Sequence, residues 1–182
     1  INPTYKKAKH YADSRGITTE DIIRYNIGYV DSGIYSGRII IPSYDVDNRL
    51  NYFIARSVFE DEKFKYKNPP VSKNVIMFEN QINWNEPITL VEGVFDAIAV
   101  KRNAIPLFGK IVLDKLKSAI ITNNVQTVYI GLDTDARAKA LEICQYFINN
   151  GITVYLIELG DTDPSELGYV EFTETYSKAR PL

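Results

Sequence analysis

One stretch of the chain, residues 88–99 (ITLVEGVFDAIA), constrains the fold more than any other. An apolar run rich in β-branched residues ends in Glu92 and Gly93, and the apolar residues that follow recur at helical spacing. This pattern predicts a buried strand, a tight turn and a helix. Glu92 would then lie at the carboxyl end of a strand, where open α/β sheets bind their ligands. Asp96 would project from the first helical turn on the same side.

A second stretch repeats this design. Residues 127–132 read as a buried strand, and Asp133 and Asp135 follow directly. Alternate residues of an extended chain face the same way, so both carboxylates would point to one side. If the two strands are neighbours, these carboxylates meet Glu92 at one edge of the sheet. Carboxylates ~4 Å apart repel by roughly 4 kcal/mol at an effective dielectric of 20, so the cluster must take up protons or a cation. Oxygen ligands select a hard ion, for which magnesium or manganese is the natural choice.

From residue 88 onward, predicted strands and helices alternate regularly. Regular alternation implies an α/β fold with a mainly parallel sheet and flanking helices, joined by right-handed crossovers. The strands are expected near 88–91, 104–108, 127–132 and 153–157, and the helices near 94–102, 111–121 and 136–150.

The N-terminal part has a different pattern. Two short helices, near 5–15 and 17–25, precede a hairpin whose strands are residues 37–42 and 50–57. A basic and aromatic segment, 63–70, follows, and its prolines keep it from being helical. A small, basic α+β subdomain is therefore expected before the parallel sheet.

Composition narrows the class of protein. The sequence is 45% hydrophobic and 24% charged, which is ordinary for a soluble globular protein. A net charge of -2 gives no overall basic character, so any affinity for nucleic acid must come from a local patch. The single cysteine, Cys144, excludes an internal disulfide and a zinc ribbon in this chain, and a buried thiol is expected. No apolar run approaches the ~18 residues that span a bilayer, so we expect a cytoplasmic protein without a membrane partner.

The two acidic stretches match a known pattern. Glu92-Gly93-x-x-Asp96 after one strand, with Asp133-x-Asp135 after a later one, resembles the Toprim domain of topoisomerases and bacterial-type DNA primases. An Asp-x-Asp motif alone is common in acidic turns. The pair of strand-anchored motifs, with a βα unit between them, is much more specific.

The N-terminal part resembles the catalytic core of bacterial-type (DnaG-like) primases. A helix pair spanning 14–29, a strand at 37–42 and a Lys-Tyr-x-Asn motif at 65–68 occur in the family's order, from about residue 5 to residue 168. This coverage separates primases from other Toprim proteins. The resemblance implies three parts: a basic primase-core subdomain (1–84), a Toprim metal-binding domain (85–168) and a C-terminal tail (169–182).

The resemblance also implies an activity. A primase core synthesises short RNA primers on single-stranded DNA by nucleotidyl transfer from NTPs, using Mg²⁺ or Mn²⁺. Two such ions and no zinc are expected in this chain. Asp133 and Asp135 are the implied main metal ligands, with Asp163 as a helper; Glu92 either acts as acid/base or bridges the ions. Asp96 is expected to orient the site.

A site with several carboxylates needs cationic side chains nearby if it is to hold DNA and a triphosphate. In primases, a basic ridge faces the acidic cluster and would bind template phosphates and the triphosphate. The residues that match this ridge, or lie beside it, are Arg38, Arg56, Lys65 and Lys67.

Two residues depart from the family pattern at the acidic edge. Ser165 stands where the family's Asp-Pro-Asp turn has its second acid, and Ala138 replaces a glycine after Asp-x-Asp. Asp161 or Glu166 could compensate. These departures bear on the geometry of a second metal ion. Together with the small size they suggest a primase from a phage or mobile element, acting in the cytoplasm of a bacterial host.

Two other functions stay open from the sequence. The first is a Toprim-type, metal-dependent nuclease, which would not need the basic hairpin upstream. The second is a non-catalytic Toprim module that only binds nucleic acid or a partner. If the chain is a primase core, a replicative helicase would bind through regions outside this sequence.

Overall fold

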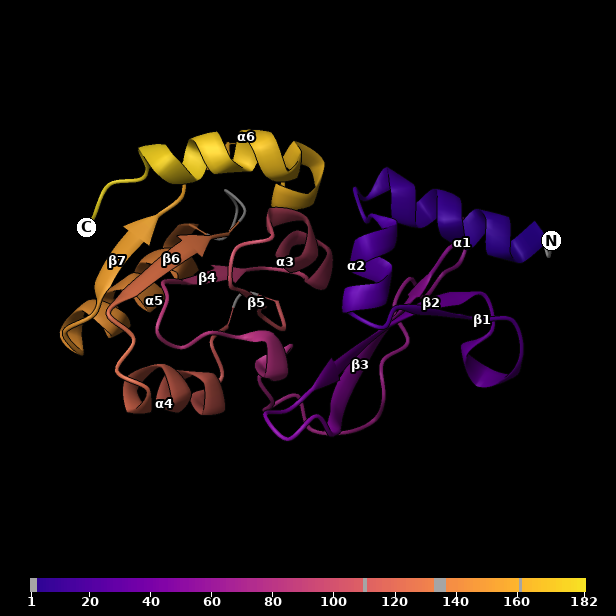
Figure 1. Cartoon of the computed structure of the whole chain (residues 1–182), viewed down its shortest axis with the longest axis horizontal. Helices are drawn as coiled ribbons and strands as arrows, with labels where there is room; N and C mark the ends of the chain where they lie inside the picture. Colours follow the sequence, from indigo (N-terminus) through magenta and orange to yellow (C-terminus); the bar gives the residue numbers. More distant parts are fainter. Residues whose placement is uncertain (1–2, 110, 133–136, 161) are drawn as a thin grey trace.

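The computed structural model describes residues 3–109, 111–132, 137–160 and 162–182. Two lobes lie side by side, the small N-terminal lobe in indigo and purple and the larger C-terminal lobe in magenta to yellow (Figure 1). The small lobe contains a three-stranded antiparallel sheet of order β1-β2-β3. Its elements are α1 (Pro3–Ser14), α2 (Thr19–Arg24), β1 (Gly28–Val30), η1 (Gly33–Tyr35), β2 (Arg38–Tyr44) and β3 (Leu50–Ser57).

The larger lobe is built on a four-stranded, parallel sheet of order β5-β4-β6-β7. The expected α/β fold, with a parallel sheet preceded by a small α+β lobe, is confirmed. The short helix η2 (Glu79–Gln81) lies in the connection between the lobes. The larger lobe's elements are β4 (Ile88–Val91), α3 (Val94–Val100), β5 (Ala104–Pro106), α4 (Asp114–Thr122), β6 (Thr127–Gly131), α5 (Arg137–Asn149), β7 (Thr153–Leu156) and α6 (Pro164–Lys178).

Every residue of β4 is buried, because helices cover both faces of the sheet. Ile88 and Leu90 pack in the core cluster that holds the buried residues of α4 and α5. Val91 faces the other way and packs with α3 and with Phe172 of α6. None of the helices in the described residues combines the length and apolarity that a bilayer span requires.

A capping box fixes the start of α2. The Thr18 side chain accepts a hydrogen bond from the Asp21 backbone N–H (3.2 Å), and Asp21 Oδ2 accepts one from the Thr18 N–H (2.9 Å). Asp21 Oδ2 also lies 3.3 Å from Nζ of Lys101, the residue that ends α3. The cap of a small-lobe helix therefore contacts the larger lobe.

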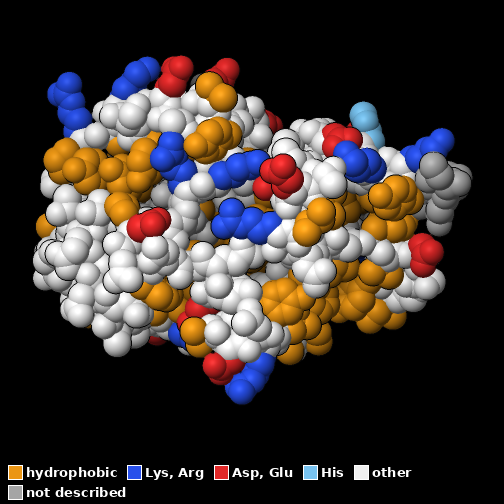
Figure 2. Space-filling model, in the orientation of Figure 1, with side chains coloured by type: hydrophobic (Ala, Val, Ile, Leu, Met, Phe, Trp, Pro, Cys, Tyr) orange, Lys and Arg blue, Asp and Glu red, His pale blue; other side chains and the backbone are white. Residues whose placement is uncertain are grey.

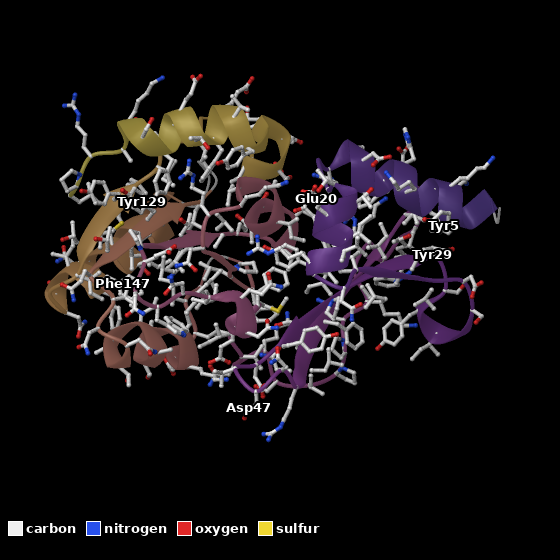
Figure 3. All side chains as sticks on the ribbon, in the orientation of Figure 1. Tyr5, Glu20, Tyr29, Asp47, Tyr129 and Phe147 are labelled. Carbon is white, nitrogen blue, oxygen red and sulfur yellow. The ribbon has the colours of Figure 1, made fainter. Side chains whose placement is uncertain are left out.

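Helix α6 was not expected from the sequence, which indicated a tail from residue 169. Phe172 is fully buried, and the Tyr176 ring stacks on Tyr129 of β6 with centroids 3.9 Å apart. Tyr129, labelled in Figure 3, lies beneath α6. A kink at Gly168, where φ is +73°, lets the helix change direction. The boundaries of the three parts stay a prediction, but residues 164–178 pack on the larger lobe.

Cys144 is 2% exposed, as expected of a structural thiol, and burial raises its pKa. We expect the native protein to react with a thiol reagent such as DTNB far more slowly than the protein unfolded in guanidinium chloride, because only the exposed thiolate is reactive. Absorbance during the two reactions measures this difference. Equal rates in the two states would show that the thiol is accessible.

Candidate active site

The carboxyl ends of two neighbouring strands form the acidic edge of the sheet. Val91, the last residue of β4, is the Cα partner of Gly131, the last residue of β6. Glu92 follows β4 directly and is half-buried. Asp133 and Asp135, predicted to follow β6, lie outside the described residues. The structure thus brings together the two strand ends that precede the predicted acids.

Asp96 connects this edge to α6. Its side chain is 7% exposed, and Oδ2 accepts a hydrogen bond from the N–H of Gly93 (2.9 Å), the residue after Glu92. Oδ1 accepts a hydrogen bond from the Ser165 N–H (3.2 Å) in the first turn of α6. Both carboxylate oxygens hold backbone groups. This arrangement suits the orienting role expected of Asp96.

Asp163 is the N-cap of α6. Its Oδ1 accepts hydrogen bonds from the Glu166 N–H and from the Ser165 hydroxyl, both at 2.8 Å. Its Oδ2 lies 4.0 Å from Nη1 of Arg15. The carboxylate predicted to assist a metal is thus engaged in capping a helix and facing a cation.

An open, net basic groove of about 960 Å³ lies between α1 and the chain that follows β3. Glu166, in the first turn of α6, also lines it, so the groove extends to the start of α6. On the face drawn in Figure 2, blue Lys and Arg side chains lie near the junction of the lobes. The cations that line the groove are Lys6, Lys7, Arg15, Arg56 and Lys65, against the acids Glu60, Asp61 and Glu166.

Arg56, which lines this groove, lies near two aromatic rings: Tyr11, which also lines the groove, and Tyr66, which lines a separate pocket. Its guanidinium carbon is 4.8 Å from the Tyr66 ring centroid and 5.6 Å from that of Tyr11. Burial raises the pKa of the Tyr66 phenol, and the nearby charge of Arg56 opposes that shift. Lys65, on the same segment as Tyr66, donates to the Glu60 carbonyl. These side chains combine cations with aromatic faces, the combination that binds single-stranded nucleic acid.

Two of the predicted cations lie elsewhere. Ile39 pairs with Arg56 and Arg38 with Ser57, so Arg38 faces the opposite side of the small sheet. Arg38 is 5% exposed, and its Nη2 donates to the Phe64 carbonyl (2.9 Å). Arg38 and Lys67 line a separate pocket of about 440 Å³. The structure therefore brings Arg56 and Lys65 into one groove, without Arg38 and Lys67.

Arg15 lines the groove, and its Nη1 lies 4.0 Å from Oδ2 of Asp163, but it was not predicted as a site residue. The signal that could have found it is the i, i+4 spacing of Tyr11 and Arg15, which places both on one face of α1. Arg15 directly follows α1, and Figure 1 shows that the end of α1 faces the start of α6.

The structure is an α/β protein in which a parallel sheet, with an acidic turn after β4, is joined to a small lobe with a basic groove. The particular fold is that of the catalytic core of bacterial DnaG primases. The chain superposes on the Aquifex aeolicus primase (zinc-binding and RNA polymerase domains) with a TM-score of 0.81 and 22% identity, over 97% of this chain and 56% of the other. It superposes on a DnaG primase catalytic domain bound to ssDNA with a TM-score of 0.81 and 20% identity, over 99% and 76% of the two chains.

The sequence itself is similar to the DNA primase of Mycoplasma genitalium, with 26% identity over 189 residues. That match covers 97% of this chain and 30% of the primase, so the chain spans less than a third of its curated relative. No protein-family model matches the sequence.

Proposed function

We propose that the chain is the RNA-polymerising core of a DNA primase, which makes short RNA primers on single-stranded DNA from NTPs. The observation that carries the proposal is the basic groove that extends to the start of α6, whose first turn is bonded to Asp96, in a chain with the fold of primase catalytic cores. Two relatives support it: one structure is described as a catalytic domain bound to single-stranded DNA, and the Mycoplasma relative is a DNA primase.

Residues at the acidic edge suit a divalent cation. The candidate ligands are Glu92, Asp133 and Asp135, an oxygen-only set that prefers Mg²⁺ or Mn²⁺. Among the described residues no group of three or more His, Cys, Asp or Glu side chains could hold a metal. Asp133 and Asp135, the other two candidate ligands, lie outside those residues. When bound, two ions would stabilise the attacking and leaving oxygens of an in-line displacement.

The chain's own residues have separate tasks in this reaction. The primer's 3′-hydroxyl attacks the α-phosphate of the NTP, the bond to the β-phosphate oxygen breaks, and pyrophosphate leaves. Glu92 would take the hydroxyl proton or bridge the metal ions. Asp96 holds the turn after Glu92 by accepting a hydrogen bond from the Gly93 N–H. Arg56 and Lys65 would bind backbone or triphosphate oxygens in the groove.

A primer-synthesis assay tests the proposal. The protein is incubated with single-stranded DNA, Mg²⁺ or Mn²⁺ and labelled ribonucleotides, with controls that omit template or add EDTA. We expect template-dependent oligoribonucleotides. DNA cleavage without synthesis would identify a nuclease instead. Neither reaction, together with a thermal stability that divalent metal leaves unchanged, would identify a non-catalytic module.

Replacing Arg56 by alanine is expected to weaken single-stranded DNA binding about tenfold and to reduce its salt slope by about 1, because one phosphate contact is lost. Fluorescence anisotropy over a salt series measures both. The matched control is Arg49→Ala, which removes a cation that is 77% exposed in the β2–β3 turn, beside Asp47 and outside the groove. If Arg56→Ala and Arg49→Ala have the same salt slope as the wild type, Arg56 does not bind phosphate.

Several finer features belong to the same proposal. Two metal ions, a helicase partner and the division at residues 84 and 168 follow from the resemblance to primases. A phage or mobile-element origin follows from the departures at Ser165 and Ala138. The separate pocket that contains Arg38 and Lys67 offers a second place for phosphate contacts.

A further inference from the structure

The small lobe contains a second pocket, of about 440 Å³, apart from the basic groove. Among the described residues, the pocket and the groove have no lining residue in common. We propose that this pocket binds a peptide segment of a partner protein, one that carries a carboxylate next to a large apolar side chain. Such a docking site goes beyond primer synthesis and does not depend on it.

Arg38 supplies the pocket with a nearly buried cation. Its side chain is 6% exposed, and its Nη2 donates to the Phe64 carbonyl at 2.9 Å. Its Nε is buried and has no hydrogen-bond partner in the part of the chain that the structure describes. A buried charged donor without a partner is unfavourable, because it has lost its contacts with water. A carboxylate bound at the guanidinium would offset that loss.

The charge of the pocket matches one carboxylate. Glu62 balances Arg38 only in part, since its Oε2 lies 3.8 Å from Nη2, beyond the ~2.7–2.9 Å of a charge-assisted hydrogen bond. Lys67 is exposed and adds a second cation, with Nζ 5.9 Å from the Tyr35 ring centroid. Two cations and one acid line the pocket, so its net charge is +1.

The rim of the pocket is apolar. Ile34, Phe64 and Tyr66 line it, and they are 71%, 65% and 50% exposed. Figure 2 shows hydrophobic side chains gathered over the strands of the small lobe. Exposed apolar side chains around a buried cation are typical of a protein interaction site. They suit an apolar peptide side chain better than the sugar–phosphate backbone of a nucleic acid, which is polar along its whole length.

Backbone hydrogen bonds hold the walls of the pocket in place. Ser57 donates to the Lys65 carbonyl at 2.8 Å, and Lys67 donates to the Ala55 carbonyl at 3.0 Å, so the segment after β3 is attached to β3. On the other side, Gly37 donates to the Val30 carbonyl of β1 at 2.8 Å. A pocket with fixed walls needs little ordering when a peptide binds, which favours affinity.

The minimal probe is the dipeptide N-acetyl-aspartyl-phenylalanine amide, which has one carboxylate and one apolar ring. Two-dimensional NMR of the ¹⁵N-labelled protein follows its binding. We expect a Kd of about 1 mM or tighter, with the largest shifts at residues 33–38 and 62–67. Two matched probes replace aspartate by asparagine or phenylalanine by glycine, and each should bind at least about fivefold more weakly.

Three variants test the residues of the pocket. Lys67→Gln should weaken the dipeptide about threefold, because an exposed cation is lost. Glu62→Gln should tighten it about threefold, because the acid that competes for Arg38 is neutralised. Residues that only stabilise the fold would not give effects of opposite sign. Arg38→Lys should weaken binding about tenfold, since lysine keeps the charge but lacks the planar fork. Arg49→Ala, in the β2–β3 turn and outside the pocket, is the control.

Phosphate is the competing occupant, because its oxygens fit the same guanidinium. Inorganic phosphate and oligo(dT) are therefore titrated in parallel. If either shifts the pocket residues at lower concentration than the dipeptide does, the pocket binds phosphate and the peptide assignment is overturned. Equal binding of the asparagine probe, or no shift at the pocket with the aspartyl probe, would overturn it as well.

Thermal unfolding of each variant checks its fold. Should Arg38→Lys fail to fold, Lys67→Gln and Glu62→Gln decide, since both side chains reach the surface. Wild-type affinity in both of these variants would contradict the assignment. Failure of the primer-synthesis assay would reject the proposed function and leave the dipeptide measurements as they are.

Discussion

Replacing Glu92 by glutamine is expected to lower primer synthesis about 100-fold or more while leaving the fold intact. Glutamine keeps the size of the side chain but removes the negative charge that would bind a divalent ion and accept a proton. Glu92 is half-buried after β4 and outside the apolar core, so the unfolding temperature should change little. The yield of labelled primer and the unfolding temperature are the two measurements.

The matched control is Glu86→Gln, which removes a carboxylate near the opposite end of the same strand. Glu86 is exposed and accepts a hydrogen bond from the Asn83 amide at 2.9 Å. It should synthesise primers like the wild type. Asp133→Ala and Asp135→Ala should behave like Glu92→Gln, and the loss of like-charge repulsion should raise their stability without metal. Wild-type synthesis by Glu92→Gln would exclude Glu92 from the chemistry.

Replacing Phe172 by alanine is expected to reduce the free energy of unfolding by about 3–5 kcal/mol, one of the largest effects a single core residue can have. Phe172 has 0% exposure and packs from α6 against α3 and the sheet. Chemical denaturation followed by circular dichroism measures the change. The expected loss of stability comes from the cavity that the substitution leaves beneath α6, which the surrounding helices cannot fill.

The control for this prediction lies two residues away on the same helix. Val170 is 69% exposed, so Val170→Ala should change the stability by no more than about 0.5 kcal/mol. If Phe172→Ala were as stable as Val170→Ala, the packing of α6 on the larger lobe would be contradicted. The hydrogen bond from the Ser165 N–H to Asp96, which depends on that packing, would then be in question too.

The parallel sheet could be predicted because its strands are short apolar runs that end in turn residues. Residues 88–91, buried on both faces, give the strongest signal of this kind. Strand β1 (Gly28–Val30) could not, because its three residues are exposed or half-buried and become a strand by pairing with β2. Helix α6 was missed because Gly168 interrupts its pattern and few of its residues are buried.

The candidate site was also only partly predictable from the sequence. The sequence predicts that each acid follows a strand but leaves open whether the two strands are neighbours; the structure pairs β4 with β6 and places Val91 opposite Gly131. The faces of the small sheet depend on the register of β2 and β3, and a shift of one residue would reverse them. The pairing of Arg38 with Ser57 therefore separates Arg38 from Arg56, although the two arginines look equivalent in the sequence.

The position of Arg15 depends on tertiary packing. Its neighbours Phe95 and Asp163 come from α3 and from the start of α6, far away in the sequence. Local patterns cannot bring such residues together, since their meeting is set by how the two lobes pack. The basic groove, which reaches from α1 to the start of α6, is therefore a result of the structure.

A crystal soaked in Mn²⁺ tests the central claim most directly, because anomalous scattering locates the ion without assumptions about activity. We expect a peak at the carboxyl edge of the sheet, about 2.1–2.3 Å from a Glu92 oxygen and from oxygens of Asp133 or Asp135, beside the groove that contains Arg56. A peak elsewhere, or none at this edge under conditions that support primer synthesis, would contradict a metal-dependent polymerase site built on Glu92.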